Sequence, residues 1–410
     1  MKTYPFFLLL ISLLFSCSKN ELAPIDESPN QIIDESTLVF QEGFTDRKLQ
    51  TNIKAIFPSD KSILLAKTLT DEGELIKFNI STQTISWQAT TWYREKAGTG
   101  NYNYQHENAI LFRQGHHDFA YSIEDGTLLY DEERLDCPSS KLTGLNHHYY
   151  TRATVKDDLT QLDKEIIYIG DIRQSDIPEV LVSPPYDSIG NNNSLGRIMG
   201  LHAFENEIGE ELLAIRYFDY DVDYPSFNDL FAMYNITQSN WVVTNALLDY
   251  HDSGTQSIEA NGLIYYGSQS YVSCIDTKTG ILKWVTEAST LSPYYLLAYA
   301  EESIFVKNHD GMVQRREAET GNLIWETHLG HMQRFMILKD KLFAIGRDFT
   351  IIDITSGEII HSFPSPYIDY DPINYFGYTS NIMGFYDDAT DVSYVFMNIG
   401  ENMISYEMEN

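Results

Sequence analysis

Two pairs of adjacent histidines are the first residues of this chain that could do chemistry. His116 and His117 precede Asp118, and His147 is followed directly by His148. Histidine nitrogens and carboxylate oxygens are common ligands of transition metals. Adjacent residues of a strand point to opposite faces, so each pair can offer only one ligand to a shared site. We therefore expect surface or loop histidines and predict no metal centre at these pairs.

An acidic run offers the second candidate chemistry. Asp219, Asp221 and Asp223 alternate with other residues, and an extended backbone would place their carboxylates on one face. Mutual repulsion there would favour a hard cation such as Ca²⁺. The run is no EF-hand, because Tyr224 stands at the sixth position, where that loop has glycine, and Leu230 stands at the twelfth, where it has glutamate. A Ca²⁺ site is one interpretation. A solvated acidic insertion between strands is the other, and we favour it.

Aromatic side chains gather in segments between the predicted strands. The candidates for a binding surface are Trp92, Tyr93, Tyr220, Tyr224, Tyr370 and Tyr375. Exposed aromatic residues anchor many protein interfaces, and they also stack on sugar rings. Tyrosine is equally an ordinary strand residue. The sequence leaves a structural role and a binding surface open.

Charge excludes one class of partner. The chain has 28 basic and 59 acidic residues, a formal net charge of −31. Nucleic-acid affinity depends on lysine and arginine neutralising phosphates, so nucleic-acid binding is excluded, whereas basic partners or divalent cations are compatible. No group of residues has the spacing of a catalytic centre, and we predict no catalytic residue.

The N-terminal residues are typical of a targeting signal. Lys2 precedes an apolar stretch over 6–15, which is too short to span a bilayer and is typical of a secretory signal. It ends in Leu-Phe-Ser-Cys17, which resembles a bacterial lipobox, whose cysteine becomes the lipidated, palmitate-bearing first residue. An ordinary signal peptide with a chance cysteine is the alternative. We predict a lipoprotein signal peptide over 1–16 and a lipidated Cys17 with a flexible tether over 17–35.

Two cysteines remain once Cys17 carries lipid. Cys137 and Cys274 could form one disulfide in an oxidising periplasm, which the sequence does not decide. Cys274 lies inside a predicted strand, where a small buried apolar residue is the expected role.

A repeated segment indicates the elements that position these residues. Each copy has a strand end, a turn and a second strand with a large ring four residues after a glycine. The strong copies contain Asp276, Gly280 and Trp284, then Gly321 and Trp325, then Asp353, Gly357 and His361; weaker copies contain Trp87, Gly126 with Tyr130, and Phe231 to Trp241. A unit that recurs about every 36 to 43 residues is typical of a repeat architecture.

The repeat predicts an all-β fold. Two further strand-like runs precede each copy, as at 262–266 and 341–345, and four strands per unit are typical of a β-propeller blade. Residues 36–410 allow eight four-stranded antiparallel blades of about 47 residues or seven of about 54, against a usual 40–50, so eight is favoured and seven is the runner-up. The runs at 166–169 and 179–182 would belong to a degenerate unit. An N-terminal strand at 37–40 would complete the last blade and remove its exposed edge.

The segments Asp276–Trp284 and Glu317–Trp325 resemble the PQQ-like β-propeller repeat. Two groups of proteins use that repeat. Quinoprotein dehydrogenases bind pyrroloquinoline quinone and calcium, and they carry a vicinal cysteine pair that Cys137 and Cys274 do not form. Lipoproteins similar to the BamB outer-membrane assembly factor group use the propeller without a cofactor, as an interaction platform. The resemblance implies the second group.

Together these observations predict a non-catalytic, lipid-anchored scaffold of the bacterial cell envelope, at the outer membrane, that binds another envelope protein. Its contact with the membrane would be through the lipid anchor only, and no cofactor is expected. A glycan- or small-ligand-binding lipoprotein is the first alternative. A quinone-dependent dehydrogenase, or another enzyme with a site in the propeller funnel, is the second.

Overall fold

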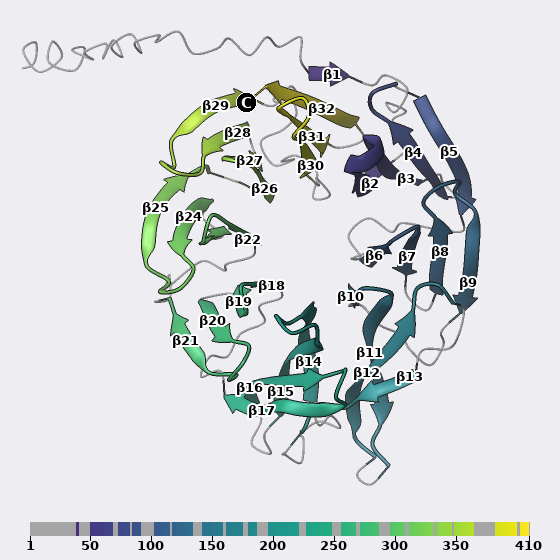
Figure 1. Cartoon of the computed structure of the whole chain (residues 1–410), viewed down its shortest axis with the longest axis vertical. Coiled ribbons are helices and arrows are strands. Elements are labelled where there is room, and N and C mark those ends of the chain that lie inside the picture. The colour runs from purple at the N-terminus through teal and green to yellow at the C-terminus, as the bar shows by residue number, and fades with distance from the viewer. Residues whose placement is uncertain are drawn as a thin grey trace, which may run out of the picture. The chain divides into compact units, whose positions relative to one another are not determined.

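The chain folds into eight four-stranded antiparallel sheets arranged as a ring, all within one compact unit over 38–410 (Figure 1). The computed structural model describes residues 38–40, 50–68, 73–82, 84–91, 102–114, 117–133, 142–158, 161–174, 179–186, 196–220, 227–247, 256–267, 271–286, 296–307, 311–330, 332, 334–346, 348–364, 382–399 and 402–409. This is an eight-bladed β-propeller, so the prediction of eight blades is confirmed and the alternative of seven is wrong.

The blades are numbered along the chain. Blade 1 comprises β2 (Gln50–Phe57), β3 (Ser62–Thr68), β4 (Gly73–Asn79) and β5 (Thr84–Thr91), with the 3-10 turn η3 (Pro58–Asp60). Blade 2 comprises β6 (Tyr102–His106), β7 (Ala109–Gln114), β8 (His117–Ser122) and β9 (Leu128–Glu133). Blade 3 comprises β10 (Leu142–Leu145), β11 (His148–Lys156), β12 (Asp163–Asp171) and β13 (Glu179–Val182). Blade 4 comprises β14 (Gly196–Glu205), β15 (Glu211–Tyr220), β16 (Phe227–Asn235) and β17 (Asn240–Leu247).

The second half of the ring continues the pattern. Blade 5 comprises β18 (Gln256–Ala260), β19 (Leu263–Gly267), β20 (Val272–Asp276) and β21 (Leu282–Val285). Blade 6 comprises β22 (Leu296–Ala300), β23 (Ser303–Lys307), β24 (Met312–Glu317) and β25 (Leu323–His328). Blade 7 comprises β26 (Arg334–Leu338), β27 (Lys341–Ile345), β28 (Asp348–Asp353) and β29 (Ile359–Pro364). Blade 8 comprises β30 (Ile382–Asp387), β31 (Val392–Ile399) and β32 (Asn402–Glu409), together with β1 (Leu38–Phe40).

In blades 1–7 the strands pair in chain order, with the first strand nearest the centre and the fourth on the outside (Figure 1). The predicted degenerate unit is blade 3, where 166–169 lie in β12 and 179–182 form β13. No helix in the described ranges is long and apolar enough to cross a membrane.

The ring is closed by the N-terminal strand, as the sequence predicts. β1 pairs antiparallel with β32, with Leu38 opposite Tyr406 and Phe40 opposite Ile404. This pairing supplies the outer strand that blade 8 lacks and joins the two ends of the propeller. It covers an edge of β32 whose N–H and C=O groups would otherwise be open to pairing with another chain.

The core lies between the blades. In β23 all five side chains are buried, and they alternate between two interfaces. Ile304 and Val306 pack with residues of blade 5, whereas Phe305 packs with residues of blade 7. Because both faces of such a strand are covered, its central residues form a continuous apolar run in the sequence instead of alternating with polar residues.

Candidate interaction surface

Three of the repeated tryptophans each lock one blade to the next. Three tryptophan rings pack on the glycine turn of the following blade: Trp87 on Gly126, Trp284 on Gly321, and Trp325 on Gly357. Gly357 has a φ of +76°, and a Cβ added there would lie 2.6 Å from Cδ2 of Trp325. Glycine is therefore needed twice, for the left-handed backbone and for the space that the ring fills.

The indole N–H groups add a hydrogen bond to each lock. Trp87 donates to the carbonyl of Ile123 (2.9 Å), and Trp284 donates to that of Ala318 (3.0 Å). Gly280 takes the same turn conformation, with a φ of +68°, but the isopropyl group of Val243 stands where the other blades have tryptophan. A buried ring with its donor satisfied gives a rigid blade contact.

The aspartates of the motif hold the turns themselves. Oδ1 of Asp276 accepts hydrogen bonds from the backbone N–H groups of Lys278 and Thr279, both at 2.9 Å. Asp353 accepts in the same way from the N–H groups of Thr355 (2.9 Å) and Ser356 (2.7 Å). An aspartate in this position stabilises a turn through its own downstream backbone.

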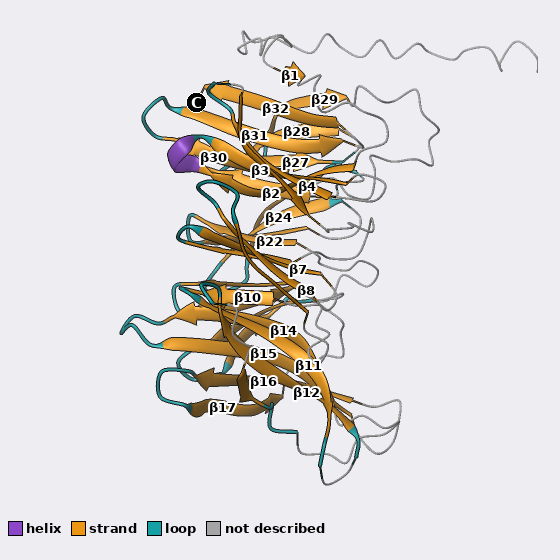
Figure 2. Ribbon diagram, turned by 90° about the vertical axis from the view of Figure 1, so that its right-hand side faces the viewer, coloured by secondary structure: helices purple, strands orange, loops and turns teal. Residues whose placement is uncertain are grey.

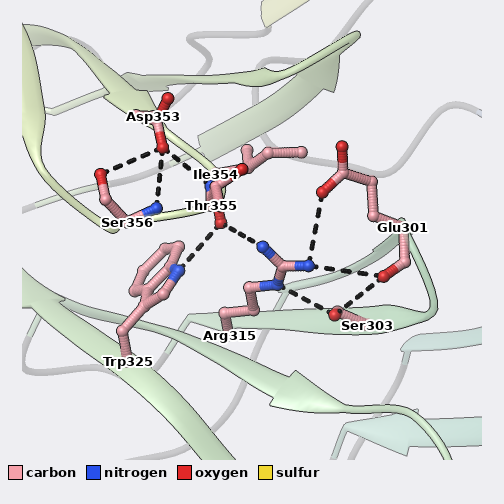
Figure 3. A network of polar contacts seen from close by, with 8 residues as sticks. All are labelled: Glu301, Ser303, Arg315, Trp325, Asp353, Ile354, Thr355 and Ser356. Carbon is pink, nitrogen blue, oxygen red and sulfur yellow. Dashed lines mark hydrogen bonds and ion pairs between the residues drawn. The ribbon is translucent and has the colours of Figure 1, made fainter.

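A partly buried arginine ties blade 6 to blade 7 (Figure 3). Arg315 donates to the carbonyl of Ile354 at 2.7 Å, and Trp325 donates to the same oxygen at 2.9 Å. Arg315 also donates to the hydroxyl of Ser303 (2.9 Å), and its guanidinium lies 5.7 Å from the ring centre of Phe305. Lys77 of blade 1 is its counterpart, because it also stands ten residues before the tryptophan of its blade and donates to the carbonyl of Ile123 that Trp87 contacts.

Two buried arginines join neighbouring blades in a similar manner. Arg216, 3% exposed, forms a bidentate ion pair with Asp229 and lies over the ring of Tyr266 in blade 5. Arg152 pairs with Glu165 at 2.7 Å and donates to a backbone carbonyl of blade 4. Each carboxylate belongs to the same blade as its arginine, and the contacts that reach the next blade are those with the ring of Tyr266 and the carbonyl of Ile198.

One face of the ring carries the short turns that follow the first and third strands of each blade, since antiparallel strands return these turns to the same end. We call it the turn face; its loops are the teal ones on the left in Figure 2. Its exposed acidic residues are Asp60, Glu107, Glu124, Asp125, Glu207, Glu301, Glu302, Glu317, Glu319, Glu358, Asp388 and Asp391. Among the described turns, the exposed basic residues are Arg173, Lys278 and Lys339, and each already pairs with a carboxylate, those of Asp171, Glu207 and Asp391. The described turn face is thus strongly acidic.

Histidines meet on the turn face between blades 2 and 3. The rings of His147 and His148 lie 3.9 Å apart, and His106 lies 6.4 Å from His147. The expectation that the two adjacent histidines point to opposite faces is wrong, because His147 lies in the turn before β11 and not in a strand. Burial and the neighbouring His148 lower the pKa of His147. The described ranges hold no group of three or more histidine, cysteine or acidic side chains arranged to bind a metal.

The remaining predicted residues are distributed as follows. Asp219 is buried near the end of β15, and Tyr220 is the last residue of that strand. Cys274 is a buried free thiol in β20, and burial raises its pKa to about 12. Cys17, Cys137, Asp221, Asp223, His116, Trp92, Tyr93, Tyr224, Tyr370 and Tyr375 lie outside the described residues.

Comparison with known proteins places the repeat in a family. Residues 237–365 match the family described as "Outer membrane protein assembly factor BamB". The match covers the three strong repeat copies, in blades 5 to 7, and identifies the fold as a PQQ-like β-propeller related to BamB. A comparison with curated protein sequences found no match.

Several solved structures share the fold. BamB from Moraxella catarrhalis is 13% identical, with a TM-score of 0.53, over 88% of this chain and 94% of that one. Saccharomyces cerevisiae Sqt1 is 10% identical, with a TM-score of 0.61, over 91% and 98%. The computationally designed Ika8 protein is 11% identical, with a TM-score of 0.58, over 88% and 97%. At these identities the likeness shows the propeller fold alone.

Proposed function

We propose that this protein is a non-catalytic, lipid-anchored scaffold of the bacterial cell envelope whose turn face binds a basic surface of another envelope protein. The observation that carries the proposal is the acidic turn face on a ring whose blades are fixed by buried contacts. Potentials of opposite sign steer association and select partners, so an acidic face favours a basic one. The kinship of residues 237–365 with BamB supports the envelope and the scaffold role.

Exposed apolar residues on the turn face support a protein partner. Ile208, 78% exposed, projects from the turn between β14 and β15 beside the exposed Glu207. An apolar side chain with charged neighbours is the usual composition at the border of a protein interface. Ile281, 64% exposed, lies in the turn before β21, and the remaining exposed large apolar residues of the described chain are spread over the outer strands of successive blades, as are Ile85, Val180 and Leu323. Such scattered residues are ordinary on a protein surface.

The anchor and the partner are tested separately. Replacing Cys17 with serine should move the protein from the membrane fraction to the soluble fraction, because a tether alone has no affinity for lipid. Affinity capture of the wild-type protein from detergent-solubilised native membranes should recover a specific envelope protein in near-stoichiometric amount. Retention of the serine variant in the membrane would reject the anchor, and capture of no specific protein would reject the scaffold role.

A further inference from the structure

Three half-buried histidines lie together on the acidic turn face. His106 ends β6 of blade 2, His147 lies in the turn between β10 and β11, and His148 begins β11 of blade 3. The ring centres of His147 and His148 are 3.9 Å apart, and those of His106 and His147 are 6.4 Å apart. We call these three residues the histidine cluster. Histidine is the side chain that changes charge between about pH 5 and 8, so the cluster can gather up to three positive charges in one place.

Contacts from three blades hold the histidine cluster in position. Nδ1 of His148 lies 3.4 Å from Oε2 of Glu211 in blade 4, and Oε1 of the same carboxylate accepts a hydrogen bond from the side-chain amide of Asn146 at 2.8 Å. The backbone carbonyl of Asn146 accepts in turn from the hydroxyl of Tyr104 in blade 2 at 2.6 Å. This network links blades 2, 3 and 4 at the turn face, so the rings are fixed beside an acidic neighbour.

The charged groups against the histidine cluster also come from these blades. Glu107 lies 3.5 Å from Nε2 of His106. Asp171 and Arg173 form a bidentate ion pair in the turn after β12, and both act on the middle ring of the cluster, as does Glu211. These three carboxylates and one guanidinium have a formal charge of −2 when the rings are neutral, and the same groups with three protonated rings have a charge of +1. Full protonation of the cluster therefore reverses the sign of the local charge.

The other ionisable groups near the cluster do not produce this change. Burial, followed by the positive charges of His148 and Arg173, lowers the pKa of His147 from its usual 6.5, although the neighbouring carboxylates oppose the shift, so this ring is neutral at pH 7.5. Burial raises the pKa of Tyr104 to about 12 and that of Tyr150 further still, so both phenols stay neutral. The reversal of local charge in mildly acidic solution belongs to the histidines.

We propose that the histidine cluster makes binding at the turn face depend on pH, so that a basic protein surface is released as the pH falls from neutral to about 5.5. Neutral rings leave the local negative charge available to lysine and arginine side chains of the partner, whereas protonated rings repel them. The two effects are reciprocal: a basic partner disfavours the protonated rings, and proton uptake by the rings weakens the complex. The inference rests on the function proposed above, since it assigns a regulation to the same face.

An octalysine peptide serves as the basic probe. Its Kd for the full chain is measured by fluorescence anisotropy at pH 7.5 and pH 5.5, at one low ionic strength so that screening is weak. For the wild type the Kd should rise about tenfold as the pH falls, because the new positive charges repel the peptide. In the triple variant His106→Gln, His147→Gln and His148→Gln the rise should be at most about threefold, which is the part that protonation of carboxylates elsewhere contributes.

Two further variants make the test specific to the histidine cluster. His328→Gln with His361→Gln removes two histidines from the outer strands β25 and β29 and should keep the wild-type dependence on pH. His147→Gln alone, at a turn position, should reduce the rise in Kd, and it decides the matter if the triple variant does not fold. An equal rise in the wild type and in the cluster variants would overturn this regulation and leave the proposed function standing. Failure of the peptide to bind the wild type at pH 7.5 would overturn both.

Discussion

Replacing Gly357 with alanine tests the lock between blades 7 and 6 in isolation. The φ of +76° costs an alanine about 1–2 kcal/mol, and its Cβ, 2.6 Å from the ring of Trp325, forces a shift that costs about 1–3 kcal/mol more. The total is about 2–5 kcal/mol. For a domain over 38–410 the unfolding entropy is about 0.8 kcal/mol/K, so the thermal midpoint should fall by about 3–6 °C.

Gly330 provides a matched control for the backbone cost. It has a φ of +65°, and an added Cβ would meet no atom of the described residues within 4 Å. Gly330→Ala should therefore lower the midpoint by only about 1–3 °C, since the left-handed backbone is the one cost that remains. Both midpoints can be read by circular dichroism at 218 nm or so, the usual β-sheet region, under one scan rate.

A double-mutant cycle then isolates the contact itself. In a Trp325→Leu background the ring is absent, so Gly357→Ala should cost no more than Gly330→Ala does, and the coupling energy should be about 1–3 kcal/mol. Additive losses in the cycle would refute the claim that ring and glycine share one space. Equal losses for the two glycine variants in the wild-type background would refute it as well.

Three further predictions concern buried groups. Arg216→Met leaves the Asp229 carboxylate uncompensated and should cost about 3–5 kcal/mol in unfolding free energy, whereas exposed Arg173→Met should cost under about 0.5 kcal/mol, both measured by urea denaturation. Cys274, with its pKa raised to about 12, should resist a thiol reagent at pH 8 until the protein unfolds, in a variant whose other cysteines are serine; fast labelling of the native state would contradict its burial. Burial lowers the pKa of His202 to about 4, so the unfolded state binds the extra proton between about pH 6.5 and 4, and stability should fall as the pH drops through that window. The difference in thermal midpoint between the wild type and His202→Phe should shift against the wild type by a few °C from pH 7.5 to pH 4.5, and a difference independent of pH would contradict the assignment.

The blade architecture could be predicted from the sequence because its signals are local. The glycine, the aspartate four residues before it and the ring four residues after it lie within one hairpin, as Asp353 and Gly357 do. Their spacing therefore forms a motif that can be recognised in the sequence. Blade 3 has lost most of this motif, and its strands could be predicted only from their apolar residues. The closing strand was also predictable, since the last unit contained one strand too few.

The contacts between blades could not be predicted in the same way. Arg315 meets Ile354 across 39 residues, and Lys77 meets Ile123 across 46. Such pairs depend on the register of two sheets, and the sequence signal is weak, since Lys77 and Arg315 both stand ten residues before a tryptophan but Cys274 holds that position in blade 5. His147 shows that short-range predictions can fail as well. The expectation from the sequence treats His147 as a strand residue, but it lies in a turn, and this changes the direction in which its ring points. The negative net charge, by contrast, follows from the composition. Its concentration on the described turn face could be recognised only once the fold was known.

The central claim is that the turn face binds the partner, and charge reversal tests it most directly. Glu302→Lys with Glu358→Lys changes two exposed turn-face residues, and Asp131→Lys with Glu326→Lys makes the same charge change on the outer strands. Capture from native membranes should recover at least tenfold less partner with the first variant and an unchanged amount with the second, at equal protein and salt. Equal recovery by both variants, or a loss confined to the outer-strand variant, would contradict the account.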